Sequence, residues 1–275
     1  MNGRNTLNLP TWVILTLVSL GCGTLQAQVP VTSGLREWLE ADVGVQTSGT
    51  SVTNWLDQSG NGNHAMQTSA ANQPTYLATG FGAANKPSVH FDGLNDFLDA
   101  GSGLNITGSG LTIFTLMRLT ANANGPGIAG NQGSGGTGYL LEEGTDDRFK
   151  FFAGIGVQTA DNVTGSWVGK PLLMTGFKDA SNVTLYTNGV QAATASSSTS
   201  ISSSSDNFLI GHNALASGFL NGDIAEILIY DRALTAQERE NVTAYFDGKY
   251  SLGIPEPSAA ALLGLGGMIL LWRRR

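Results

Sequence analysis

Residues 221–234 read Asn-Gly-Asp-Ile-Ala-Glu-Ile-Leu-Ile-Tyr-Asp-Arg-Ala-Leu, and Thr235-Ala236-Gln237-Glu238 follows at once. The apolar run over 224–230 predicts a buried strand, because it is short and turn-forming residues bound it. Thr235 and Glu238 have the spacing of a capping box, in which the two residues satisfy each other's backbone N–H groups. Apolar positions at Val242, Tyr245 and Phe246 then follow at helical spacing. We therefore expect a strand that leads into a short C-terminal helix.

On both sides of this stretch the pattern is one of strands and turns. Period-two alternation over 88–92 and 111–116 predicts strands, and Asn188-Gly189 predicts a type I′ hairpin because both residues tolerate positive φ. The Ser- and Thr-rich segment 196–205 predicts a solvated loop. Further short apolar runs predict strands over 149–153, 172–177, 183–186 and 208–210.

The composition suits an all-β protein. Of the 275 residues, 41% are hydrophobic, 13% are charged and 37 are glycine. Glycine adopts positive φ without strain, so its abundance fits many short strands joined by tight turns. The chain has room for one large all-β domain.

The net charge excludes one class of partner. The whole chain carries −7, and residues 28–254 contain ten basic and twenty acidic residues, a net charge of −10. A domain this acidic repels nucleic acid and anionic lipid. We expect no nucleic-acid partner.

Residues 1–27 have the three parts of a secretory signal peptide. Arg4 gives a positive start, residues 12–20 an apolar core, and Leu25-Gln26-Ala27 a small residue at the cleavage position. Cleavage there removes Cys22, the single cysteine, and leaves a protein without thiols. The alternative is acylation of Cys22, because Ser19-Leu20-Gly21-Cys22 resembles a lipoprotein signal with serine in the usual place of leucine. Either route exports the domain.

Residues 255–275 form a second targeting segment. Pro255-Glu256-Pro257 precedes an apolar run over 258–272 and the basic tail Arg273-Arg274-Arg275. The run is short for a spanning helix, which needs roughly 20 residues, and the basic tail would stay in the cytoplasm. An ordinary tail anchor is the simpler interpretation.

This order of motif, apolar run and basic tail resembles the PEP-CTERM sorting signal of Gram-negative bacteria that make extracellular polysaccharide. The resemblance implies an exosortase-type processing enzyme as a partner and a membrane-anchored precursor that inserts transiently into the inner membrane. It also implies a final location at the cell surface or in the extracellular matrix.

The middle of the chain resembles LamG-type jelly-roll domains of the concanavalin A-like lectin/glucanase superfamily. The resemblance rests on segments 34–42, 55–63, 87–98, 185–189 and 221–234, which occur in the family's order. It implies a β-sandwich of two antiparallel sheets with roughly a dozen strands, followed by a short helix. The predicted organisation is therefore a signal peptide over 1–27, a LamG-like domain over 28–254 and a sorting segment over 255–275.

Two loops are rich in the oxygen donors that calcium prefers. One contains Asp57 and Asn61, and the other contains Asp92 and Asp96. The resemblance raises the expectation of calcium, because many domains of this superfamily bind it at a sandwich edge. The alternative is that these side chains cap turns through their own backbone. Calcium is the only cofactor we expect, and these four residues are its candidate ligands.

The sequence offers weak candidates for sugar stacking. Trp38 and Trp55 lie among apolar neighbours, which predicts core positions, and Trp167 precedes a strand. Tyr76 and Tyr139 remain, both in loops rich in glycine and threonine.

No catalytic residues are predicted. Glucanases of this fold carry two carboxylates on one face of a strand, whereas Glu142-Glu143 with Asp146-Asp147 has the wrong spacing and predicts a solvated turn. The three histidines, His64, His90 and His212, are scattered along the chain.

These observations predict a non-enzymatic exported protein that associates with extracellular polysaccharide or with a neighbouring cell-surface protein. Three alternatives stay open: a calcium-dependent lectin module, a polysaccharide-active hydrolase or lyase, and a structural matrix component without a specific ligand.

Overall fold

The computed structural model describes residues 28–255 apart from 122–124, 145, 147, 155, 164–166 and 216–217. The predicted signal peptide over 1–27, including Cys22, lies outside the described residues. So do the sorting-segment residues Glu256, Pro257, Arg273, Arg274 and Arg275. Among the described residues, no helix is long and apolar enough to cross a bilayer.

The described chain is mostly β, as the sequence predicts. It contains two 3₁₀ turns, seventeen strands and one α-helix; three of the strands have only two residues, which accounts for part of the excess over the expected dozen. The strands are β1 (Leu35–Glu40), β2 (Val45–Ser48), β3 (Ser51–Trp55), β4 (Ala65–Met66), β5 (Thr75–Phe81), β6 (Lys86–Asp92), β7 (Leu98–Asp99), β8 (Leu111–Leu119), β9 (Gly127–Gly130), β10 (Tyr139–Glu143), β11 (Arg148–Ala153), β12 (Gly156–Val163), β13 (Leu172–Lys178), β14 (Asn182–Thr187), β15 (Val190–Ser196), β16 (Leu209–Ile210) and β17 (Asn221–Tyr230), and the helix is α1 (Ala236–Tyr250).

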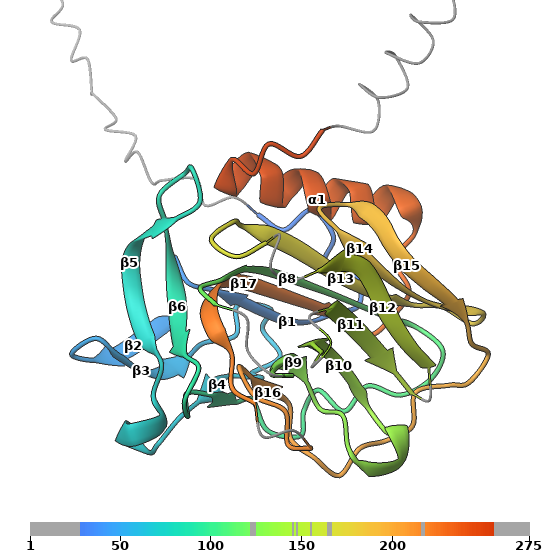
Figure 1. Ribbon diagram of the computed structural model, residues 1–275, viewed down its shortest axis with the longest axis horizontal. Coiled ribbons are helices and arrows are strands. Elements are labelled where there is room, and N and C mark those ends of the chain that lie inside the picture. Colours follow the sequence, from blue (N-terminus) through green and yellow to red (C-terminus); the bar gives the residue numbers. More distant parts are fainter. Residues whose placement is uncertain are drawn as a thin grey trace, which may run out of the picture.

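Hydrogen bonds link the strands into one continuous antiparallel sheet, which is folded into two layers (Figure 1). The first layer has the order β1–β17–β8–β13–β14–β15, with β6 beside the first half of β17. The second layer has the order β7–β16–β9–β10–β11–β12. The arrangement is the predicted β-sandwich.

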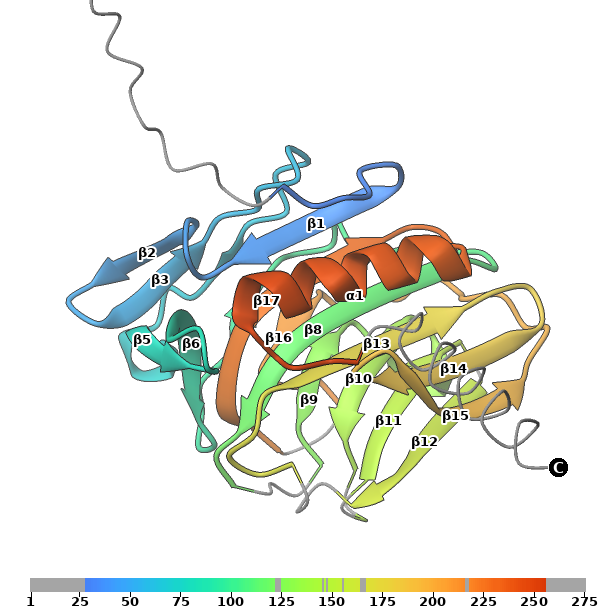
Figure 2. The ribbon, with the colours of Figure 1, turned by 90° about the horizontal axis from the view of Figure 1, so that it is seen from above.

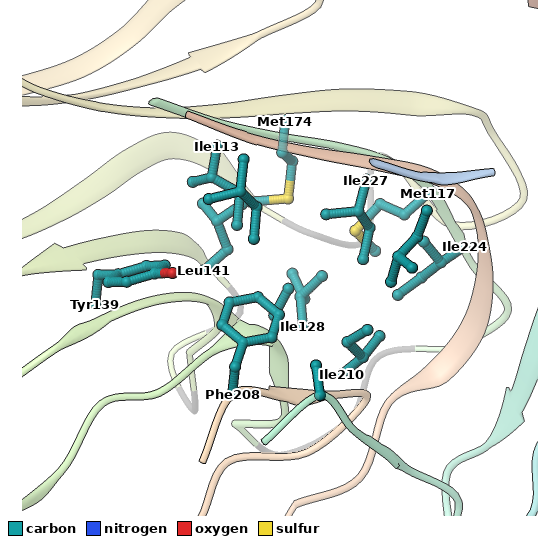
Figure 3. Close-up of a cluster of buried hydrophobic side chains, with 14 of the residues drawn as sticks. Ile113, Met117, Ile128, Tyr139, Leu141, Met174, Phe208, Ile210, Ile224 and Ile227 are labelled. Atoms are coloured by element: carbon teal, nitrogen blue, oxygen red, sulfur yellow. The ribbon is translucent and has the colours of Figure 1, made fainter. Parts of the chain in front are cut away.

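The main hydrophobic core fills the space between the layers. Figure 3 shows Ile113, Met174 and Ile227 pointing from the first layer toward Phe208 and Ile210 on the opposite side. The residues labelled in that view are almost fully buried. Burial of these side chains provides most of the driving force that holds the layers together.

The central strands of the first layer, β17, β8 and β13, are buried on both faces, which the sequence did not predict. In β8, Ile113 and Met117 enter the main core, whereas Phe114 and Leu116 face α1 in a second hydrophobic cluster. Helix α1 lies along β8 and β17, between β1 and β13–β15 (Figure 2). The alternating pattern of this strand therefore separates two cores rather than core from solvent.

The capping box at the start of α1 is confirmed. The Thr235 hydroxyl accepts a hydrogen bond from the Glu238 N–H, and the Glu238 carboxylate accepts one from the Thr235 N–H. The hairpin at Asn188-Gly189 is also confirmed, since both residues have positive φ, 49° and 75°. These two local motifs fix the ends of α1 and β14.

A network of buried charges lies between α1 and the first layer. The Lys249 ammonium is 2.6 Å from Glu226 and 2.7 Å from Glu40, and its side chain is only 5% exposed. Trp38, Tyr245 and Tyr250 each donate a 2.8 Å hydrogen bond to the Glu226 carboxylate. Burial raises the pKa of Glu226 although Lys249 opposes the shift.

A β-bulge directs Glu226 toward this network. The register between β17 and β8 shifts between Ile224 and Glu226, so Ala225 is the extra residue of β17. A bulge inserts one residue and changes which side chains face each side. Ala225 and Leu228 consequently belong to the cluster under α1, while Ile224 and Ile227 enter the main core.

The chain stays docked on the domain after α1 ends. Ser251 takes the left-handed conformation that terminates the helix, and Leu252 and Ile254 pack against the cluster under α1. The Ile254 N–H donates a 2.9 Å hydrogen bond to the Asp247 carboxylate. Pro255, the first residue of the predicted sorting motif, follows directly.

Candidate functional site

A groove of about 600 Å³ lies where the outer face of the first layer extends beyond α1. Strands β13, β14 and β15 form its floor, and the residues around the start of α1 form its wall. Figure 2 shows α1 over the centre of the layer and β14 and β15 beside it, and residues from the start of α1 and from these strands line the groove. We take this groove as the candidate site.

The floor is built from side chains that share the outer face of three strands; in β15 a register shift places both Gln191 and Thr194 on that face. Phe177 of β13, Thr184 and Tyr186 of β14, and Gln191 and Thr194 of β15 all line the groove. Alternate residues of a strand share a face, and their neighbours Val183 and Leu185 enter the main core instead. The hydroxyls of Thr184 and Thr194 are 2.8 Å apart and form a hydrogen bond across the two strands.

Arg239 connects the wall to the floor. Its guanidinium carbon lies 4.3 Å from the centre of the Phe177 ring and 5.1 Å from that of Tyr186. It also donates a 2.6 Å hydrogen bond to the Leu234 carbonyl and a 3.3 Å hydrogen bond to the Tyr186 hydroxyl. Stacking on two rings fixes the planar guanidinium in one orientation.

Asp179 is the only acidic residue among the described residues that line the groove, and it has a local role. One oxygen of its carboxylate accepts hydrogen bonds from the backbone N–H groups of Ser181 (2.8 Å) and Asn182 (2.7 Å). This Asx turn closes the connection between β13 and β14. The neighbouring Lys178 side chain donates to the carbonyls of Asp179 and Ser197.

The wall is held in place by ion pairing at the start of α1. Arg232 forms two hydrogen bonds with the Glu238 carboxylate, at 2.7 and 2.9 Å. Arg232 and the Thr235 backbone hold the pKa of Glu238 at about 2, below its usual value. Glu238 is therefore ionised and fully engaged at neutral pH.

The predicted calcium residues lie in two separate loops. Asp57 accepts four hydrogen bonds, from the backbone of Trp38, Ser59 and Asn63 and from the Ser59 hydroxyl. The side-chain amide of Asn61 donates to the carbonyls of residues 35 and 36 at 3.0 and 3.2 Å. In this geometry both side chains hold the 57–63 loop against β1.

Asp92 and Asp96 lie together at the end of β6. Asp92 accepts hydrogen bonds from Leu94 and Asn95, and Asp96 accepts one from the Asp92 N–H. Burial and the nearby Asp92 raise the pKa of Asp96 to about 6. No group of three acidic, histidine or cysteine side chains converges on a metal position within the described residues. Calcium binding stays a prediction, which the change of Tm on chelation would test.

The aromatic residues considered for stacking have other positions. Trp38, Trp55 and Tyr139 are buried, and the Tyr139 hydroxyl donates to the Leu104 carbonyl within the core. Tyr76 and Trp167 pack partly against the main core. The sequence did not point to Phe177, Tyr186 or Arg239. The positions of these residues in the predicted strands and helix indicate only that their side chains point away from the core. They do not reveal that the three side chains meet.

The predicted solvated turn around Glu142 is wrong in part. Glu142 and Glu143 belong to strand β10, and Glu143 is fully buried. Asp146 lies in an exposed turn, where it pairs with Lys150 at 2.9 Å, and Asp147 lies outside the described residues. These polar residues form a strand rather than a turn because β10 pairs with both β9 and β11, which satisfies its backbone on both sides. Burial raises the pKa of Glu142 to about 7.

Two family models match the chain. The model described as the concanavalin A-like lectin/glucanases superfamily matches residues 91–238, which include the whole groove floor. The model of the PEP-CTERM protein-sorting motif matches residues 253–275. The chain belongs to the concanavalin A-like lectin/glucanases superfamily, and it carries a sorting motif that marks it for export and exosortase processing. No curated protein matches the sequence.

Solved structures share the fold at low identity. Domain 4 of AbnA, a GH43 extracellular arabinanase from Geobacillus stearothermophilus solved with arabinotriose, has a TM-score of 0.56 and 14% identity over 78% of this chain and 98% of that chain. The binding domain of Paraclostridial Mosquitocidal Protein 1 has a TM-score of 0.55 and 15% identity, over 78% of this chain and 53% of that one.

Trypanosoma rangeli sialidase is similar to the chain over a smaller part of its own length. Its TM-score is 0.53 and its identity 14%, over 80% of this chain and 33% of that chain. The chain thus spans about a third of the sialidase. Identities at this level show the fold alone.

Proposed function

We propose that this chain is a non-enzymatic protein of the bacterial cell surface or extracellular matrix that binds extracellular polysaccharide in the groove beside α1. The observation that carries the proposal is the convergence of Asn182, Gln191 and Thr194 on one open face, with the buried Thr184 hydroxyl bonded to that of Thr194. Amide and hydroxyl groups of this kind are the usual hydrogen-bonding partners of sugar hydroxyls. An open groove also admits the middle of a long polymer, which a closed pocket does not.

The comparisons support this proposal in two ways. The sorting motif directs the chain outside the cell, where polysaccharide is available. The AbnA domain, solved with arabinotriose, is an example of a similar fold that carries an oligosaccharide.

The test is affinity electrophoresis of the exported protein through gels that contain polysaccharides. We expect retardation by at least one polymer, and we expect the double variant Gln191→Ala/Thr194→Ala to lose it. The matched control is Gln46→Ala/Thr47→Ala, which removes the same two side chains from the exposed strand β2. Equal retardation of both variants would place binding outside the groove, and no retardation by any polymer would reject the proposal.

A hydrolase is the competing proposal, and Glu142 is the residue that favours it. A carboxyl group with a pKa of about 7 is suited to general acid catalysis. Glycoside hydrolysis usually needs a second carboxylate, however, and the nearby Asp146 is paired with Lys150. We expect no new reducing ends when the exported protein is incubated with a polysaccharide panel. New ends that disappear in Glu142→Gln would establish an enzyme instead.

A further inference from the structure

Arg239 is unusual among the cations of this acidic domain. Acidic residues outnumber basic ones two to one over 28–254. Arg118, Arg232 and Lys249 each form an ion pair with a buried or half-buried carboxylate. Arg239 forms none with any carboxylate in the described part of the chain, and its two hydrogen bonds go to neutral oxygens.

The aromatic rings of the groove are already in use. The guanidinium of Arg239 lies over both Phe177 and Tyr186, and these two rings meet edge to face at 6.4 Å. Phe177 is also only 8% exposed. A sugar ring therefore has little aromatic face on which to stack, and recognition depends on the charge and the hydrogen-bonding groups.

The other charged side chains near the groove are bonded within the protein. The Asp179 carboxylate is held by two backbone N–H groups and lies beside the Lys178 ammonium. Glu238 is paired with Arg232. The start of the fifteen-residue helix α1 adds a partial positive charge at the wall. Arg239 is thus the one cation among the described residues that line the groove, and its charge has no carboxylate partner there.

We propose that the groove binds an acidic polysaccharide and that Arg239 receives the carboxylate of a uronic-acid residue. This inference rests on the function proposed above and names the class of its ligand. A guanidinium presents five N–H donors in a planar fork that matches a carboxylate, and only two bonds are made to the protein. The hydroxyls of the same sugar unit and its neighbours bind the exposed amide of Gln191 and the hydroxyl of Thr194.

The experiment compares matched polymers that differ only in charge. Polygalacturonate, alginate and hyaluronan are tested beside their carboxyl-reduced, neutral forms, with affinity measured by titration calorimetry on the exported protein. We expect at least one acidic polymer to bind roughly tenfold or more tightly than its reduced form, since bonds to charged groups are the stronger ones. That preference should weaken as salt is raised.

Arg239 is tested by two variants and one control. Arg239→Met keeps the packing of the stem and should abolish the preference for the acidic form, and Arg239→Lys keeps the charge without the fork and should retain part of it. Arg148→Met, which removes an arginine from the second layer, should bind as the parent does. Thermal unfolding within a few degrees of the parent shows that each variant is folded.

The outcomes separate this inference from the proposed function. Equal or tighter binding of the reduced polymers, lost in Gln191→Ala/Thr194→Ala, would overturn the uronate assignment and leave polysaccharide binding intact. A preference for the acidic form that persists in Arg239→Met would show that another residue recognises the carboxylate, and it would also overturn the uronate assignment. Failure of every acidic and neutral polymer to bind would overturn the proposed function itself.

Discussion

The two ends of helix α1 carry cations in opposite situations. Near its C-terminus, Lys249 is 5% exposed and lies between the carboxylates of Glu40 and Glu226. Near its N-terminus, Arg239 lies over two aromatic rings at the edge of a groove and has no carboxylate partner in the described chain. The first cation fixes the helix on the sheet, whereas the second is the one that we propose binds an acidic ligand. Pairing and burial together therefore distinguish a charge that builds the fold from a charge that serves binding.

The largest effect is expected from the removal of Lys249, which tests whether this cation fixes the helix on the sheet. Lys249→Met leaves two buried carboxylates without their cation, and removing one partner of a buried ion pair costs about 3–5 kcal/mol. We expect a loss of this size in the free energy of unfolding, measured by urea denaturation. The control is Lys86→Met, whose partly exposed pair with Asp42 should contribute no more than about 1 kcal/mol. Similar losses in the two variants would contradict the structural role of Lys249.

A second substitution sharpens the interpretation of the same network. In the triple variant Glu40→Gln/Glu226→Gln/Lys249→Met no charge of this network remains, so we expect the free energy of unfolding to recover about 2 kcal/mol of the loss seen in Lys249→Met. The amide oxygen at position 226 still accepts the hydrogen bond from Tyr245, and the amide NH2 at the former Oε2 position can donate to the Tyr250 hydroxyl instead. A triple variant less stable than Lys249→Met would show that the carboxylates stabilise the fold without their cation.

Removing Arg239 should have a smaller effect on stability. Arg239→Met loses two contacts with aromatic rings and the bond to the Leu234 carbonyl, which together are worth about 1–2 kcal/mol. The free energy of unfolding from urea denaturation is again the measurement. A loss as large as that of Lys249→Met would remove the distinction between the two ends of the helix.

The smallest effect is expected at Asp96, whose carboxylate accepts a hydrogen bond from the Asp92 N–H but has no ion pair in the described chain. Asp96 has a pKa raised to about 6, so the folded protein holds this proton more tightly than the unfolded chain does. The contribution to stability is therefore fully present below about pH 4 and is lost as the pH rises through 6. Asp96→Asn should flatten this part of the pH dependence, measured as the difference in the free energy of unfolding from the parent between pH 4 and pH 7.5. An unchanged profile would mean that Asp96 titrates normally.

Local motifs made much of the fold predictable from the sequence. The capping box at Thr235 and the Asn188-Gly189 turn depend on neighbouring residues, and both have the expected geometry. The apolar run of β17 gave the central strand of the first layer. The same reasoning failed at Glu142 and Glu143, because polar side chains do not reveal that two partner strands enclose them.

The groove could not be predicted, because it depends on which elements become neighbours. Phe177 and Tyr186 come from adjacent strands, but Arg239 joins them only after β15, β16 and β17 have been added to the sheet. Strand parity shows which side chains leave the core, and it does not show what covers them. The calcium residues are the reverse case, since the two loops and their hydrogen bonds depend on neighbouring residues, and calcium binding by either loop stays a prediction.

The docking of Ile254 has a mechanical consequence for the end of the chain. Its N–H is bonded to Asp247, and Pro255 is the next residue, so almost no tether separates the domain from the sorting motif. Two residues of extended chain reach at most about 7 Å. An enzyme that acts on Pro255-Glu256-Pro257 therefore meets the end of α1 immediately beside its substrate, and the contour of the folded domain there becomes part of what that enzyme must accommodate.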